Sequence, residues 1–334
     1  MNSLYKKVES KFKNVNIPLF RNACIGIFKN NLKLESRLDA EHLFYLNPFF
    51  SKFRVILFGH HSYGYRTIIN QNSQTNHVFV NTRISRINII LDNEDIIKKY
   101  CNSSSILFYG GDDKKIPNRF LEENKSSFRK ILVETLTENA SFGCLTFPSI
   151  GNLRYFLNGN IKCFNKFLDN SNIPKKTNLV CGASGYYYKN IDEAVTDRSN
   201  LNKFSTDNNK FIQNIFCEPK KYLTNKAKYK FFMCPRGRGI QANKIWESLI
   251  CNTIPVMTDH PNIRQLKEIY KIPIHIVNDW NEITEENLNE VFEKEYKNYD
   301  WELLKKKFLI DNFFNWIESS IDEQESGDVK CKSI

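Results

Sequence analysis

The chain has 334 residues and a mass of 39.3 kDa, and 41% of its residues are hydrophobic, among them 26 Phe and 15 Tyr. This composition excludes a disordered chain, and the length predicts two globular domains of roughly 150 residues each. The formal charge of +11 and the pI near 9.1 favour anionic partners, although scattered lysines in an Asn/Lys/Ile-rich sequence also arise from compositional bias.

In the first half, short apolar runs alternate with longer segments of helical spacing, which is typical of parallel sheets with crossover helices. The expected strands are 53–58, 77–80, 87–91 and 106–109, and helical spacing is clearest over 126–136 and 152–168. Two of the strands end in glycine-rich turns, Gly59-His60-His61 and Gly110-Gly111-Asp112-Asp113. The polar segment 169–177 contains a proline and is the expected interdomain linker.

After this segment the alternation resumes, and strands are expected at 178–181, 230–233, 253–257 and 273–277. Helices are expected near 191–202, 240–251, 262–270 and 284–296, and the spacing of Trp, Leu and Phe over 301–321 predicts a packing helix. The predicted domains are therefore 1–172 and 173–300, followed by a packing helix and tail over 301–334.

Nine cysteines occur singly, without a CxxC pair and mostly within apolar runs. This pattern favours reduced, buried thiols over a disulfide framework or a zinc site, and thus a cytoplasmic protein. The N-terminal sequence lacks the apolar region of a signal peptide, and no apolar stretch reaches the ~18 residues that cross a bilayer. We therefore expect neither secretion nor a membrane span.

The segment 229–256 contains the most informative pattern: a strand, the basic turn Arg236-Gly237-Arg238-Gly239, a helix and a second strand. Gly237 and Gly239 let the backbone approach a phosphate, the helix start presents free N–H groups, and the two arginines can bind phosphate oxygens bidentately. Lys244 and Glu247 are expected on one helix face, the lysine near the phosphates and the carboxylate near ribose hydroxyls.

Each part of this pattern also has an ordinary structural interpretation. The glycines are compatible with a simple turn, and the arginines with solvated side chains. Lys244 and Glu247 are compatible with a surface ion pair worth a few tenths of a kcal/mol. The dinucleotide fingerprint GxGxxG and the phosphate loop GxxxxGK[ST] are both absent.

The run FMCPRGRGIQANKIWESLICNTIPVM resembles the exostosin-like glycosyltransferase pattern of an apolar strand, Pro-Arg-Gly-x-Gly, a basic residue, Glu-Ala-Leu and Gly-Cys-Ile-Pro-Val. The segment 272–284 is similar to that family's strand ending in Asp-Trp-x-Glu-Ile. The segment 222–230 stands where the family has the Tyr-x-x-x-x-x-x-Ser-Lys-Phe sequence that precedes the basic turn. Arg198 falls where a further donor-site arginine is expected. The resemblance covers roughly 180–300, and almost nothing before 170 is similar.

The sequence also departs from that pattern. Lys244 stands where arginine is commoner, Ser248 replaces Ala, and Cys251-Asn252 replaces Gly-Cys. Lys244-Ile245-Trp246 also resembles the alpha-1,3-fucosyltransferases, another inverting family with a similar fold.

Both resemblances imply a GT-B type α/β fold, in which two Rossmann-like domains face each other across a cleft. They imply an inverting, metal-independent glycosyltransferase that moves a sugar from a UDP- or GDP-sugar to a hydroxyl of a glycan or glycoprotein, with no cofactor. Arg236, Arg238 and Lys244 would neutralise the diphosphate in place of a metal, which agrees with the lack of an Asp-x-Asp motif.

In the same scheme Glu247 would bind the ribose, and the turn at 182–185, with Ser184, would form the opposite wall of the donor site together with Arg198. The general base would come from the N-terminal domain, where His60, His61, Asp112 and Asp113 stand at predicted strand ends.

Three alternatives stay open: a fucosyltransferase-like GT-B enzyme that uses GDP-fucose, a non-catalytic relative that binds nucleotide only, and a basic nucleic-acid-binding protein. The last has no zinc-finger or RRM signature to support it, so no nucleic-acid partner is expected. We expect a cytoplasmic enzyme of glycan biosynthesis from a microbe or a large virus, in the latter case in the host cytoplasm or the virion.

Overall fold

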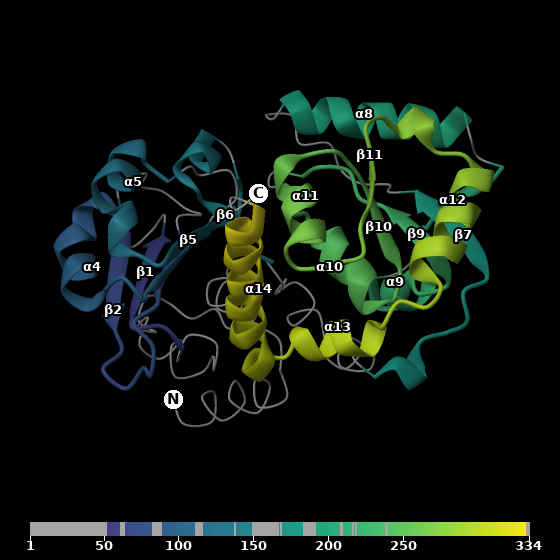
Figure 1. Ribbon diagram of the computed structural model, residues 1–334. Helices are drawn as coiled ribbons and strands as arrows, with labels where there is room; N and C mark the ends of the chain where they lie inside the picture. Colours follow the sequence, from purple (N-terminus) through teal and green to yellow (C-terminus); the bar gives the residue numbers. More distant parts are fainter. Residues whose placement is uncertain are drawn as a thin grey trace, which may run out of the picture. The chain divides into compact units, whose positions relative to one another are not determined.

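The computed structural model of the chain describes residues 52–60, 64–81, 89–110, 116–136, 138–148, 167, 169–182, 192–207, 210–215, 217, 219–237 and 240–331. The chain divides into two compact units, Met1–Leu157 and Asn158–Ile334. Each unit has its own β-sheet, with helices in the connections between strands (Figure 1). The fold is mixed α/β with parallel sheets, as the alternation of apolar runs predicts.

The sheet of the first unit has six strands in the order β2-β1-β3-β4-β5-β6. They are β1 (Val55–His60), β2 (Gly64–Ile69), β3 (Val78–Asn81), β4 (Ile106–Gly110), β5 (Lys130–Val133) and β6 (Leu145–Thr146). β1 and β2 form an antiparallel hairpin, whereas β1, β3, β4, β5 and β6 pair in parallel. The connections contain η2 (Leu91–Asn93), α4 (Glu94–Tyr100), α5 (Asn118–Asn124), η3 (Lys125–Ser127) and η4 (Glu138–Phe142).

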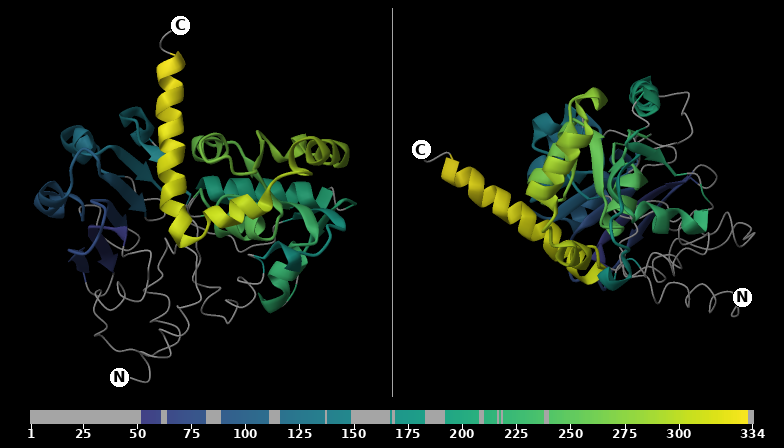
Figure 2. Two further views of the ribbon diagram at one scale, coloured as in Figure 1. Left: turned by 60° about the horizontal axis from the view of Figure 1, so that its bottom comes forward. Right: turned by 90° about the vertical axis from the view of Figure 1, so that its right-hand side faces the viewer.

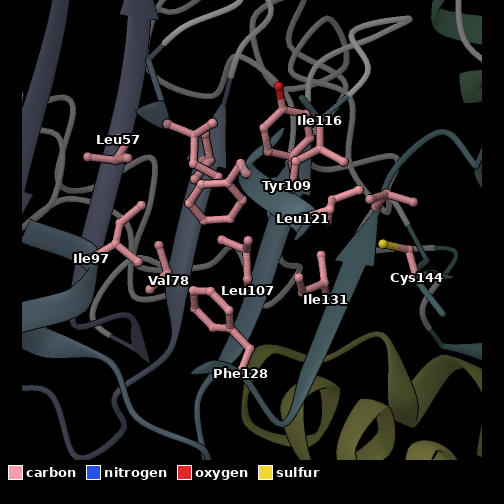
Figure 3. Packing of buried hydrophobic residues seen from close by; sticks show 14 of the residues in the cluster. Leu57, Val78, Ile97, Leu107, Tyr109, Ile116, Leu121, Phe128, Ile131 and Cys144 are labelled. Carbon is pink, nitrogen blue, oxygen red and sulfur yellow. The ribbon is translucent and has the colours of Figure 1, made fainter. Parts of the chain in front are cut away.

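The core of the first unit lies where alternate strand residues meet the helices. Val78 and Leu107 pack in one buried cluster with Ile97 of α4 and Leu121 of α5 (Figure 3). Successive residues of a strand point to opposite faces, so the intervening phenylalanines face the other way. There Phe53, Phe79, Phe108 and Phe147 form a fully buried aromatic cluster with ring centroids 5.2 to 5.5 Å apart. Burial on both faces explains why these strands read as continuous apolar runs.

The sheet of the second unit has five parallel strands in the order β11-β10-β9-β7-β8. They are β7 (Asn178–Gly182), β8 (Ile212–Asn214), β9 (Tyr229–Met233), β10 (Ile254–Thr258) and β11 (His275–Val277). The connecting helices are α8 (Asp192–Asp207), α9 (Pro219–Lys226), α10 (Asn243–Ile250) and α11 (Pro261–Glu268). Outside these connections lie η5 (Asn170–Asn172), η6 (Trp280–Glu282), α12 (Glu285–Val291) and the π-helical turn η7 (Phe292–Tyr296).

This strand order has one topological switch point. From β7 the chain moves outward through α8 to β8, and then returns through α9 to β9 on the other side of β7. Because parallel crossovers are right-handed, α8 covers one face of the sheet, and α9, α10 and α11 cover the other. The segments that follow β7 and β9 therefore leave the sheet toward opposite faces. In doubly wound sheets a crevice opens at such a point, outside the carboxyl ends of the strands.

Local signals in the sequence fix the helix ends around this sheet. His260 caps α11, since its Nδ1 accepts from the N–H of Asn262 at 3.1 Å, and Pro261 follows in the first helical turn. The residue after the C-cap of α10 is Asn252, whose φ of 54° is a left-handed conformation that asparagine tolerates better than most residues. α10 thus ends where the chain must turn into β10.

Two helices, α13 (Trp301–Lys307) and α14 (Ile310–Cys331), close the second unit where one packing helix was expected. Trp316 of α14 stacks edge-on against Tyr270 and packs beside Phe308, which itself contacts Trp246 of α10. α14 runs as one unbroken helix in both views of Figure 2. Within the part of the chain that the structure describes, none of the helices has the length and apolar character needed to cross a bilayer.

Three expected elements differ from the structure or lie largely outside the described residues. The expected helix over 126–136 is wrong, because this segment contains η3 and the buried strand β5. The expected strand over 87–91 is wrong for its last three residues, which form a turn and the start of η2, and 87–88 lie outside the described residues. The expected helix over 152–168 lies outside them too, apart from Phe167, which is helical.

The segment expected to link the domains is packed into the second unit. Lys176 Nζ donates to the carbonyls of Ala227 and Cys251 at 2.9 and 2.8 Å and to Thr253 Oγ1 at 2.9 Å. These acceptors stand just after α9 and α10, so the lysine satisfies carbonyl groups at the ends of both helices.

Candidate functional site

The basic turn follows β9 at the switch point of the second sheet. β9 ends at Met233, and Cys234-Pro235-Arg236-Gly237 continue from its carboxyl end toward α10. Gly182, the last residue of β7, lies on the other side of the switch point. Arg238 and Gly239 lie outside the described residues, as does Ser184. The turn therefore occupies the position where open α/β sheets bind their ligands.

Two consecutive residues of α8 hold the backbone of Arg236. Asp197 Oδ2 accepts from the N–H of Arg236 at 2.8 Å, and Arg198 Nε donates to its carbonyl oxygen at 2.7 Å. The Arg236 side chain extends to the next strand end, where its Nη2 donates to the carbonyl of Asp259 at 3.0 Å. Both backbone groups and the guanidinium of Arg236 are thus held by neighbouring elements.

Asp197 also ties this turn to two other segments at the same edge of the sheet. Its Oδ1 accepts from Trp280 Nε1 at 2.8 Å and from Thr258 Oγ1 at 3.3 Å. Thr258 is the last residue of β10, and Trp280 begins η6 shortly after β11. One carboxylate therefore connects the segments that follow β9, β10 and β11.

Asp259 is balanced by a different cation. Its carboxylate forms a two-point ion pair with Arg264 of α11, and this hydrogen-bonded arginine holds the Asp259 pKa below its ordinary value. The Asp259 charge is therefore neutralised locally and leaves the charge of Arg236 in place.

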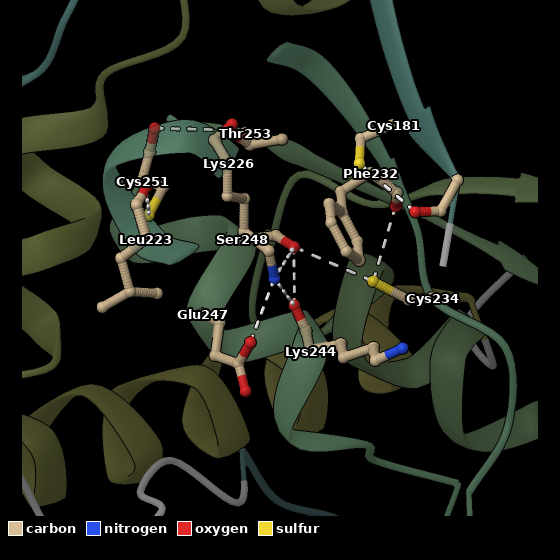
Figure 4. Close-up of polar contacts among 11 residues, drawn as sticks. Cys181, Leu223, Lys226, Phe232, Cys234, Lys244, Glu247, Ser248, Cys251 and Thr253 are labelled. Atoms are coloured by element: carbon tan, nitrogen blue, oxygen red, sulfur yellow. Dashed lines mark hydrogen bonds and ion pairs between the residues drawn. The ribbon is translucent and has the colours of Figure 1, made fainter. Parts of the chain in front are cut away.

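The helix after the turn carries Lys244 and Glu247, and the two are not ion-paired with each other. Glu247 Oε2 instead lies 3.1 Å from Nζ of Lys226, the last residue of α9. In Figure 4 the Lys244 side chain extends away from Glu247, toward Cys234. The Lys226 and Glu247 side chains are 0% and 7% exposed, so Glu247 belongs to a buried ion pair and not to a surface pair with Lys244.

Lys226 is enclosed by polar and aromatic groups. Its Nζ lies 3.4 Å from both the carbonyl of Lys244 and Oγ of Ser248. It also lies over the rings of Phe232 and Tyr222, 3.7 and 4.9 Å from their centroids. Cation–π contacts of this kind compensate part of the loss of hydration that a buried ammonium suffers.

Burial is the main cause that lowers the pKa of Lys244 to about 8. The neighbouring cations Lys226 and Arg198 also lower this pKa, and each has a larger effect than Glu247, which raises it. An anion placed beside Lys244 would reverse this effect, because an opposite charge favours the protonated amine. Lys244 is thus a buried amine whose charged form a neighbouring anion would stabilise.

The structure brings together Arg198, Arg236, Gly237, Lys244 and Glu247, the described members of the predicted donor site, on α8, the turn and α10. Of the four predicted general bases, His60 is the last residue of β1 in the first unit, and His61, Asp112 and Asp113 lie outside the described residues. Their role stays a prediction.

Sequence reasoning missed Asp197 and Lys226. Asp197 directly precedes Arg198, but nothing in a polar helix marks it as the partner of a turn that follows two strands later. Lys226 is one of many lysines, and only the fold shows that it is buried. In the described ranges, no three or more His, Cys, Asp or Glu side chains form a possible metal site.

Neither a scan of protein-family models nor a search of curated proteins finds a match to this sequence. The functional assignment therefore depends on the site itself.

Proposed function

We propose that the chain is an inverting glycosyltransferase of the GT-B type that binds a nucleotide-diphosphate sugar at the β9–α10 turn. In this proposal the two units face each other across a cleft, and the first unit binds a glycan or glycoprotein acceptor. The observation that carries the proposal is the position of the basic turn, which leaves the carboxyl end of β9 at the switch point of an all-parallel sheet.

The charge of the described site supports a diphosphate ligand. The turn and α10 are surrounded by four cations and two carboxylates. The cations are Arg198, Lys226, Arg236 and Lys244, and the carboxylates are Asp197 and Glu247. Two positive charges therefore remain in excess, which matches the charge of a diphosphate bridge between a nucleoside and a sugar. Arginine adds the bidentate geometry that suits phosphate oxygens.

The proposed chemistry follows from this charge. The acceptor hydroxyl oxygen attacks the anomeric carbon while the bond from that carbon to the diphosphate breaks, and the nucleoside diphosphate leaves with the electron pair. Arg236 and Lys244 stabilise the charge that develops on the leaving group, so the proposal requires no metal for this step. The hydroxyl proton passes to a base on the acceptor side, for which His60, His61, Asp112 and Asp113 are the predicted candidates.

A thermal-shift screen against UDP-, GDP- and CMP-sugars tests the proposal. A ligand at about 100 times its Kd stabilises the folded protein by about 2.7 kcal/mol, so one nucleotide class should raise Tm clearly. UDP- and GDP-sugar hits are then assayed for release of nucleoside diphosphate, and CMP-sugar hits for release of CMP, in the presence of glycan acceptors. Binding without release identifies a non-catalytic relative, whereas salt-sensitive binding of random DNA or RNA without any nucleotide-sugar shift overturns the proposal.

A further inference from the structure

Lys226 is a buried cation that no ligand can reach directly. Its side chain is 0% exposed, and its ammonium is surrounded by Glu247 Oε2, the Lys244 carbonyl, Ser248 Oγ and the Phe232 ring (Figure 4). These four groups lie on β9 and α10, the elements on either side of the basic turn. Besides its charge, Lys226 can therefore influence a ligand only through the groups that it holds.

A buried ion pair is by itself weak evidence of a stabilising role. Burying two charges costs each of them its hydration, and replacing a buried ion pair by apolar side chains of similar volume is often neutral or stabilising. The pair is also asymmetric. Lys226 Nζ donates a hydrogen bond to Oε2 of Glu247. The other carboxylate oxygen, Oε1, makes no hydrogen bond to any residue in the described part of the chain. Glu247 therefore has one fixed oxygen and one that can accept from a ligand.

The lysine restricts the position of the carboxylate. The ammonium is itself fixed by the Phe232 ring at 3.7 Å and the Tyr222 ring at 4.9 Å, so the bond to Glu247 defines where that carboxylate lies. The lysine also balances the charge of the carboxylate, whose Oε2 lies 3.1 Å from Nζ. An ionised carboxylate only accepts hydrogen bonds, and therefore selects ligand groups that donate them.

We propose that Lys226 is a positioning residue that holds Glu247 to accept a hydrogen bond from a ribose hydroxyl, and that this pair makes the site selective for ribonucleotides over deoxyribonucleotides. This inference rests on the proposed function, because it assigns a step of recognition to the same donor site. A hydrogen bond to a carboxylate contributes enough to make the ribonucleotide bind about 10- to 100-fold more tightly than the analogue that lacks the hydroxyl.

The experiment compares, by titration calorimetry, UDP and GDP with their 2′-deoxy and 3′-deoxy analogues. The test variant is Lys226→Met/Glu247→Gln, which removes both charges together and so leaves no unpaired buried ion. Glu247→Gln alone is a second variant that keeps the shape of the side chain and weakens its acceptor. Lys228→Met is the matched control, because Lys228 is exposed and stands close to Lys226 in sequence. Urea titrations verify that each variant is folded.

The wild type and the Lys228→Met control should bind the ribonucleotide about 10- to 100-fold more tightly than one of the deoxy analogues. The double variant should bind both forms with one affinity, near that of the wild type for the deoxy analogue. Equal wild-type affinities for ribo and deoxy forms, or undiminished discrimination in the double variant, overturn this inference and leave the proposed function in place. If neither UDP nor GDP binds, both proposals fall.

Discussion

Replacing Asp197 with asparagine should loosen the segments at the carboxyl edge of the second sheet. The Asp197 carboxylate accepts from Arg236 N at 2.8 Å through Oδ2, and from Trp280 Nε1 at 2.8 Å through Oδ1. An amide has only one oxygen, so in either orientation its NH₂ group faces one of these two N–H donors. Losing a hydrogen bond to a charged acceptor and leaving a donor unsatisfied costs about 2 to 3 kcal/mol.

This loss is measurable by urea unfolding followed by tryptophan fluorescence, because Trp280 is itself a partner of Asp197. We expect Asp197→Asn to lower the free energy of unfolding by about 2 to 3 kcal/mol with an unchanged m-value. Nucleotide affinity should fall as well, since the backbone of Arg236 loses one of its two contacts with α8. The control is Asp207→Asn, which makes the same charge change at an exposed position of α8.

An Asp197→Asn variant that stays within about 0.5 kcal/mol of the wild type, like the control, would refute the reasoning. It would mean that the three strand-end segments are held together by other contacts.

Three further predictions concern buried groups of the second unit. Burial lowers the pKa of Lys244 and of Lys305 to about 8 from the ordinary 10.5, so near pH 8 the unfolded chain binds more protons at these groups and the free energy of unfolding should rise with pH. Urea titrations from about pH 7 to about pH 8.5 measure this, because at higher pH the buried thiols, whose pKa burial raises, act in the opposite direction. A flat or falling profile over this range contradicts the prediction. Lys176→Met strips three acceptors of their donor and should destabilise by about 2 to 4 kcal/mol in the same assay, whereas the exposed Lys175→Met should not. Burial raises the pKa of Cys181 and Cys251 to about 12 and of Cys234 to about 11, so mass spectrometry should find the exposed Cys217 alkylated by iodoacetamide at pH 8 well before these three.

Strands buried on both faces were the most predictable elements. The runs at 106–109 and 230–233 match β4 and β9 to within one residue, because a strand covered on both sides is apolar throughout. β5 was misassigned to a helix because Ile131, Leu132 and Leu136 satisfy helical spacing as well as a short buried strand does. β2 was missed because it is an edge strand that begins with glycine and includes polar residues.

The site was predictable only where its chemistry is contiguous in sequence. Arg236, Gly237 and Lys244 could be placed near one another because a strand, a glycine turn and a helix follow directly in the chain. Asp197 reaches Arg236 only because the return crossover from β8 places β9 beside β7, with the carboxyl ends of both strands at one edge. Lys226 meets Glu247 because α9 and α10 cover the same face. These contacts depend on strand order, which local sequence does not encode.

Titration calorimetry of UDP and GDP with the wild type and Arg236→Ala tests the central claim most directly. The Arg119→Ala variant, at an exposed helix position of the first unit, controls for loss of one positive charge. Losing a charge-assisted hydrogen bond to a phosphate should weaken binding about 10- to 100-fold in Arg236→Ala and leave Arg119→Ala unchanged. Failure of both nucleotides to bind the wild type, or equal affinity in Arg236→Ala, would contradict a diphosphate site at this turn.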